Sequence, residues 1–151
     1  MNDNATLISL ISALGPNFVY NLDFIPADKF DWKPATTAKS VKEILDHLLG
    51  NFDMINGQFA EVPERQPLTD IAGAKAALQA AIETYIQNLT DATPEKLASE
   101  VKLPHFSLPL SSLTKVAVGD TINHHGQITY IQSLLGDDES HFLPDFFQKL
   151  A

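Results

Sequence analysis

The chain has 151 residues, of which 44% are hydrophobic and 19% charged, and this length and composition are typical of one folded domain spanning residues 1–151. It has no cysteine, which excludes disulfides, thiolate metal sites and cysteine nucleophiles. The net charge of -9, with Arg65 as the single arginine, disfavours binding to nucleic-acid phosphates. No uninterrupted apolar run approaches the ~20 residues of a membrane helix, and Asp3 stands where a secretory signal would be basic. We therefore expect a cytoplasmic protein without membrane contact.

Helical spacing of apolar residues begins near the N-terminus and predicts a first long helix over residues 4–23. The segment 25–34 contains two prolines and is expected to be a loop or a short helical turn. Ser40 and Glu43 then form a capping-box pattern, in which each side chain can bond the other residue's backbone amide. This pattern predicts the start of a second helix, which continues to Ile55.

The second half of the chain is also expected to be helical. The remaining elements are, in order, a third helix capped by Thr69 or Asp70, a short helix that starts at 93–95, an extended connection at 101–109 with room for one short strand, a fourth long helix from Ser111 or Ser112 to Gly136, and an aromatic tail helix at 142–150. Four long helices, each with an apolar stripe to bury, favour an all-α four-helix bundle with a short extra C-terminal helix.

Polar residues interrupt the apolar stripe of the fourth long helix. That stripe is expected to consist of Leu113, Val116, Ile131, Leu134 and Leu135. Asp120 and His124 project within about 20° of its centre line. A carboxylate in that position needs a proton, a cation or a metal, because an unpaired buried charge costs several kcal/mol. Asp120 and His124 can also simply pair with each other or line a wet crevice.

Side chains four residues apart on one helix can bind the same ion, so Asp120 and His124 are candidate metal ligands. A third ligand must come from another helix, and His47 lies on the flank of the second helix's stripe. Two histidines and one carboxylate would leave coordination positions open, as catalytic metal sites do. Gln127 lies one turn beyond His124 and either contacts a ligand or substrate or serves as a helix-contact amide. From its position on the helix, His125 is expected at the rim or on the surface.

Three segments resemble the DinB/YfiT-like metalloenzyme family of four-helix bundles. They are Ile25 to Pro34 (IPADKFDWKP), Ser40 to His47 (SVKEILDH) and Asn123 to Gly136 (NHHGQITYIQSLLG). In that family one histidine of the second helix and two ligands four residues apart on a later helix hold the metal. The matching positions are His47, Asp120 and His124. The commoner family pattern has histidine at the position of Asp120 and arginine at that of His125.

The resemblance implies a metal-dependent enzyme, most often a thiol S-transferase or a related hydrolase or isomerase. The divalent ion would be zinc or nickel, with iron or manganese as further candidates, and the substrate a small molecule such as a low-molecular-weight thiol. No catalytic side chain beyond the ligands and no site for an organic cofactor is assigned. Gln127, His125 and Asn51 are candidates for contacting the ligands or the substrate.

Two further expectations concern the assembly and a different class of function. The tail helix carries Phe142, Phe146, Phe147 and Leu150, more apolar surface than one small bundle covers, which predicts a homodimer. The resemblance points the same way. The alternative function is a non-catalytic helical-bundle protein, acting in binding or in a stress response, whose polar residues are structural or vestigial.

Overall fold

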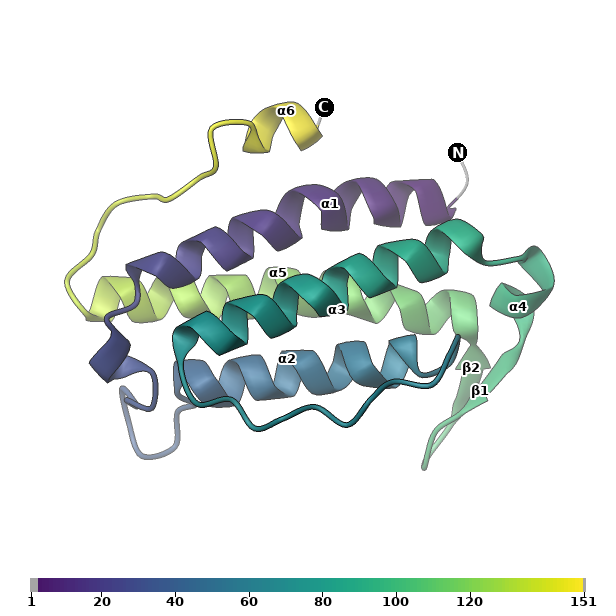
Figure 1. The fold of residues 1–151 in the computed structure, drawn as a ribbon, viewed down its shortest axis with the longest axis horizontal. Coiled ribbons are helices and arrows are strands. Elements are labelled where there is room, and N and C mark those ends of the chain that lie inside the picture. The colour runs from purple at the N-terminus through teal and green to yellow at the C-terminus, as the bar shows by residue number, and fades with distance from the viewer. Residues whose placement is uncertain (1–2, 151) are drawn as a thin grey trace.

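The computed structural model describes residues 3–150, which fold around four long helices (Figure 1). These are α1 (Asp3–Asn21), α2 (Val41–Asn56), α3 (Ile71–Asp91) and α5 (Leu110–Leu134). The shorter elements are η1 (Leu22–Phe24), η2 (Ala27–Lys29), α4 (Pro94–Ala98), β1 (Glu100–Lys102), β2 (Ser107–Pro109) and α6 (Phe146–Leu150). The predicted all-α fold with a short C-terminal helix is confirmed.

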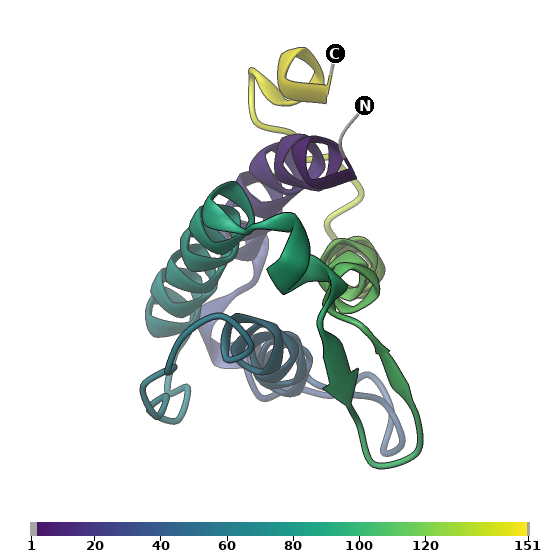
Figure 2. The same cartoon turned by 90° about the vertical axis from the view of Figure 1, so that its right-hand side faces the viewer.

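The four long helices form a bundle in which α1 and α2 occupy opposite corners. Both α1 and α2 pack against α3 and against α5, and the end-on view in Figure 2 shows the four helices around a common centre. Large side chains fill that centre, among them the fully buried Phe18, Phe52 and Tyr85. Tyr85 also donates a hydrogen bond from its hydroxyl to the carbonyl oxygen of Thr114 at 2.8 Å, which joins α3 to α5.

Local capping signals position the start of α2 and of α3. The Ser40 hydroxyl accepts from the Glu43 amide at 3.2 Å, and the Glu43 carboxylate accepts from the Ser40 amide at 2.9 Å. This capping box confirms the predicted start of α2. At α3, the Asp70 carboxylate accepts from the Gly73 amide at 2.7 Å, so Asp70 is the cap rather than Thr69.

The start of α5 differs from the prediction. The helix begins at Leu110, directly after β2, and its cap position is Pro109, which makes no side-chain capping bond. The expectation that Ser111 or Ser112 caps the helix is therefore wrong. The amide of Leu110 instead donates to the Ser99 carbonyl at 2.9 Å. Ser99 directly precedes β1 and Leu110 directly follows β2, so the antiparallel hairpin of these two strands brings the Leu110 amide to a backbone partner in place of a capping side chain.

The buried face of α5 also lies partly off the predicted line. Leu113 and Ile131 are buried, but Val116 is 38% exposed and Leu134 is 46% exposed. The prediction that the latter two belong to the core is wrong, because α5 contacts both α1 and α2 and its buried surface follows those two neighbours. The buried residues of its central part are Ala117, Val118, Thr121, His124 and Ile128.

The first helix is more hydrophobic than the count of uninterrupted apolar residues suggested. Within the described part of the chain, the segment Asn4–Phe24 is long and apolar enough to cross a membrane by length and composition, with a mean hydropathy of 1.2. The core helix of a bundle passes the same test. In this structure 44% of the hydrophobic window is buried, and Ile11, Phe18 and Leu22 are fully enclosed where α1 packs against α3 and α5.

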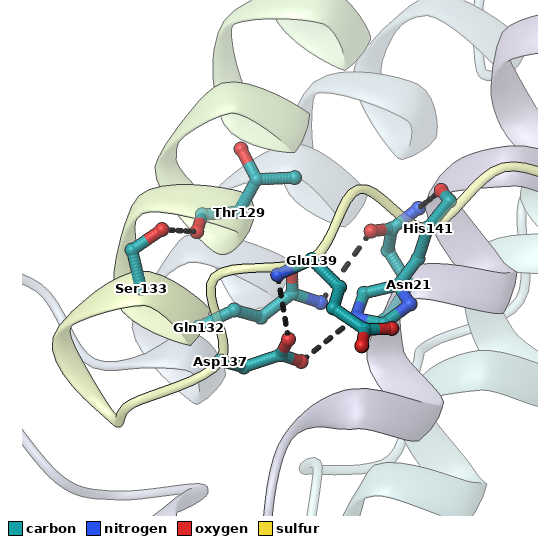
Figure 3. Close-up of polar contacts among 7 residues, drawn as sticks. All are labelled: Asn21, Thr129, Gln132, Ser133, Asp137, Glu139 and His141. Atoms are coloured by element: carbon teal, nitrogen blue, oxygen red, sulfur yellow. Dashed lines mark hydrogen bonds and ion pairs between the residues drawn. The ribbon is translucent and has the colours of Figure 1, made fainter.

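A network of hydrogen bonds joins residues 137–141, which follow α5, to the end of α1 (Figure 3). Asn21 donates from Nδ2 to the carbonyl oxygen of His141 at 2.9 Å, and Gln132 donates from Nε2 to the Asn21 carbonyl at 2.7 Å. His141 contacts the Asp137 carboxylate through Nε2 at 2.8 Å, and its ring stacks on that of Phe24. The chain is therefore held against α1 before it reaches α6.

The tail helix α6 is shorter than the predicted range 142–150. The amide of Leu143 donates to Asn17 Oδ1 at 2.9 Å, so this stretch is bonded to α1 and helical structure begins only at Phe146. Phe146 is buried, whereas Phe142 and Phe147 remain largely exposed.

We predict that His141→Ala releases the segment after α5. The hydrogen bond from His141 is the largest cause of a lowered pKa of the Asp137 carboxyl. A lowered carboxyl pKa stabilises the fold at pH values above the ordinary value of 3.8, and this stabilisation disappears as the pH falls through the lower folded-state value. Hydrogen exchange of residues 137–143 at neutral pH should be faster in His141→Ala than in wild type, and the difference should become smaller in strong acid, where only the lost ring contact with Phe24 remains. Ser140→Ala is the control, and equal exchange at neutral pH would contradict the prediction.

Two glycines give a paired test of helix packing. A Cβ at Gly119 would meet no atom within 4 Å, so Gly119→Ala should raise the free energy of unfolding by about 0.5–1 kcal/mol through lower unfolded-state entropy. A Cβ at Gly15 would lie 2.7 Å from Cδ1 of the buried Ile82, where α1 meets α3. Gly15→Ala should therefore gain less than Gly119→Ala, as measured by urea denaturation. A larger gain at Gly15 would show that α1 and α3 do not pack this closely.

Candidate metal centre

The three predicted ligands lie along the contact between α2 and α5. His47 of α2 lies beside His124 of α5, with ring centroids 5.2 Å apart and ring planes at 83°. One turn further along α2, Asn51 lies beside Asp120, which precedes His124 by one turn. The two helices therefore run antiparallel here, and their packing brings all three predicted ligands to one region.

His124 is the most enclosed member of this group, with 4% of its surface exposed. Its Nδ1 lies 2.7 Å from Oε1 of Gln127. Because an amide oxygen can only accept a hydrogen bond, this contact places the imidazole proton on Nδ1 and leaves a lone pair on Nε2. His124 Nε2 is itself buried and has no hydrogen-bond partner among the described residues.

Asp120 is half-buried and bonds to an amide rather than to a histidine. Its Oδ2 accepts a hydrogen bond from Asn51 Nδ2 at 2.6 Å. Among residues 3–150 no hydrogen bond or ion pair joins Asp120 to His124, so the pairing that their spacing allows is not formed. A neutral dipole therefore compensates the carboxylate in this structure.

His47 lies at the solvent-exposed edge of the group, and its Nε2 is 3.4 Å from Asn51 Nδ2. The Asn51 amide thus stands between His47 and Asp120. Within the part of the chain that the structure describes, no three His, Asp or Glu side chains are arranged so that they could hold one metal ion. The structure brings His47, Asp120 and His124 into one neighbourhood without converging them on a point.

The remaining candidates have different surroundings. Gln127 is exposed but orients the His124 ring through the bond described above. His125 is half-buried, more enclosed than the rim position expected for it, with its ring 5.5 Å from that of Phe18. Burial lowers the pKa of His125, which favours the neutral imidazole. The bond between Asn51 and Asp120 was not predicted, because neither residue type indicates a partner on another helix.

A cavity of about 350 Å³ opens next to this group. Gln127 lines it together with Ile44 of α2, Ile131 of α5 and Lys39 of the preceding loop. Larger hollows of about 600, 530 and 510 Å³ lie between α5 and the tail segment, between α1 and α3, and beside η1 and the start of α3. His47, Asp120 and His124 line none of these four cavities, and the cavity of about 350 Å³ adjoins the group only through Gln127, which contacts His124.

Comparisons with known proteins agree with this architecture. The chain is similar to the crystal structure of a DinB-like protein, YjoA, from Bacillus subtilis, with a TM-score of 0.73 and 21% sequence identity over 91% of this chain and 96% of that chain. At this identity the likeness shows the fold alone. No curated protein matches the sequence. A family profile described as the DinB superfamily matches residues 14–128, which include the candidate ligands on α2 and α5. Because this match covers most of the sequence, the chain belongs to the DinB superfamily.

Proposed function

We propose that this protein is a metal-dependent enzyme that binds one divalent ion through His47, Asp120 and His124 and uses it to activate a low-molecular-weight thiol or a water molecule. Thiol S-transfer is the first candidate reaction, and related hydrolase and isomerase reactions use the same activation. Zinc and nickel suit two imidazoles and one carboxylate best, and iron and manganese are also compatible.

The observation that carries this proposal is the buried, unpartnered Nε2 of His124. An unsatisfied buried polar atom costs about 1–3 kcal/mol, and an ion would satisfy it. A zinc–nitrogen bond is about 2.0–2.1 Å long, so two imidazoles that share a tetrahedral ion have ring centroids roughly 5 Å apart. The 5.2 Å separation between His47 and His124 fits that requirement.

The residues around the site have separate tasks in this proposal. When bound, a divalent ion with open coordination positions lowers the pKa of a coordinated thiol or water. Gln127 keeps His124 in the tautomer whose Nε2 can act as a ligand. Asp120 offsets part of the ion's charge. Ile44 and Ile131 give the neighbouring cavity apolar walls against which the apolar part of a small substrate can pack.

A second candidate is a non-catalytic binding or stress-response protein in which these polar residues are structural. The bond between Asn51 and Asp120 favours it, because this bond already gives the carboxylate a partner. The lack of a converged three-ligand group among residues 3–150 also favours it. Metal binding separates the two candidates.

His124→Leu provides that test. In chelator, the variant should be as stable as the wild type or up to about 1 kcal/mol more stable, because it removes an unsatisfied buried nitrogen. Zinc at about 100 times its Kd should stabilise the wild type by about 2.7 kcal/mol. It should not stabilise the variant. Thermal melts of protein purified without an affinity tag measure both effects.

His105→Leu, a substitution at an exposed loop histidine, is the matched control and should respond to zinc as the wild type does. A wild-type melting temperature that is the same in zinc and in chelator would exclude the metal site. A thiol-conjugation assay with and without chelator then tests the enzymatic part of the proposal. Conjugation that chelator does not reduce would argue against metal-dependent chemistry.

We also propose that the protein is a cytoplasmic homodimer that does not bind nucleic acid. Phe142, Phe147 and Leu150 leave apolar surface exposed on the tail segment and α6, while Phe146 anchors this cluster in the fold. A second copy would cover that surface. The net charge of -9 opposes contact with a phosphate backbone.

Phe147→Asp should therefore convert the dimer to a monomer. Phe147 is 67% exposed, so a charge there costs the folded monomer little but would be buried in the dimer. Light scattering should give twice the chain mass for the wild type and the chain mass for the variant. Tyr130→Asp, also at an exposed aromatic residue but on α5, is the control and should stay dimeric. A monomeric wild type at working concentration would refute the dimer.

A further inference from the structure

The position of Asn51 has a consequence for how an ion could enter the site. Asn51 Nδ2 lies 2.6 Å from Asp120 Oδ2 and 3.4 Å from His47 Nε2. Both neighbouring atoms are electron-pair donors of the kind that bind a divalent ion. An amide NH2 group carries two hydrogens and a partial positive charge, so it can face both atoms at once.

Among the described side chains, no lysine or arginine is paired with the Asp120 carboxylate in place of the Asn51 amide. Arg65 is paired with Asp46 and Asp53, both on α2, and no described lysine or arginine forms an ion pair with Asp120. The Asn51 amide is therefore the group that compensates Asp120 in this structure. It does so from a point between two of the proposed ligands.

We infer that the Asn51 side chain occupies the place of the ion in the metal-free protein, and that binding a divalent ion requires this amide to move away. The inference rests on the proposed metal site and adds a competitor to it. Asn51 then weakens metal binding, because its hydrogen bond to Asp120 stabilises only the metal-free state. The affinity of the site for the ion is the free energy of coordinating the ion minus the free energy of the Asn51–Asp120 hydrogen bond that must first be broken.

The alternative role for Asn51 is that of a supporting residue that holds Asp120 while Asp120 binds the ion. A supporting donor contacts a carboxylate on the side away from the other ligands. Here the donor nitrogen also lies close to His47 Nε2, on the side that faces the other ligands. The two roles predict opposite effects of removing the amide, so one substitution distinguishes them.

The test is zinc titration of wild type, Asn51→Ala and Asn123→Ala by calorimetry, starting from chelator-treated protein. A hydrogen bond to a charged group contributes about 1.5–3 kcal/mol, and each 1.4 kcal/mol is a factor of ten in Kd. Asn51→Ala should therefore bind zinc about tenfold more tightly or better. Asn123 is exposed on α5 near the site, and Asn123→Ala should leave the Kd unchanged.

Unchanged zinc affinity in Asn51→Ala would overturn the inference, and so would a Kd that is about 10–100-fold weaker, as expected for the loss of a supporting residue. Absence of zinc binding in the wild type and in both variants would instead reject the metal site itself.

A second measurement does not depend on the folding of a variant. The side-chain NH2 resonances of Asn51 in the wild type should shift over the same zinc range as the imidazole resonances of His47 and His124, and resonances that stay in place would also overturn the inference.

Discussion

The packing of α2 against α5 is the contact on which the candidate site depends. Because α1 and α2 occupy opposite corners of the bundle, α2 can bury its apolar stripe only against α3 and α5. Residues such as Ile44, Leu48 and Phe52 fix its rotation by being buried on that side. His47 then lies at the solvent edge of the contact, and Asn51 follows one turn later. The core thus determines where the polar side chains of α2 meet those of α5.

Local signals predicted most of the fold. The capping box at Ser40 and Glu43 involves only four consecutive residues, so it can be predicted without knowing how the rest of the chain packs. The buried face of α5 depends instead on two neighbouring helices. Val116 and Leu134 both project about 60° to the same side of Leu113, and they were misplaced because α1 and α2 leave that edge of the stripe exposed. The first residue of α5 was misplaced because the hairpin, which joins distant residues, provides its hydrogen bond.

The candidate site was predictable only in part, for the same reason. A spacing of four residues predicted Asp120 and His124 on one face of α5, and in the structure that face lies toward α2, with His47 beside His124 and Asn51 beside Asp120. The contacts of these side chains depend on the relative shift of two helices and on rotamers. Neither quantity is contained in residue spacing. The bond between Asn51 and Asp120 is of this kind, and it decides which group compensates the carboxylate.

The hydrogen bond that Asp120 receives from Asn51 does not remove the electrostatic argument for the proposed metal site. A hydrogen bond from an amide orients a dipole toward the carboxylate but leaves its full negative charge in place, within a chain whose net charge is -9. The lone pair of His124 Nε2 adds a second uncompensated electron-pair donor in the buried part of the contact. The proposed metal site therefore rests on two groups that do not bond to each other: a carboxylate held only by a neutral amide and a buried imidazole nitrogen without a partner among the described residues. A direct bond between Asp120 and His124 would have removed both of these features and, with them, the argument for an ion.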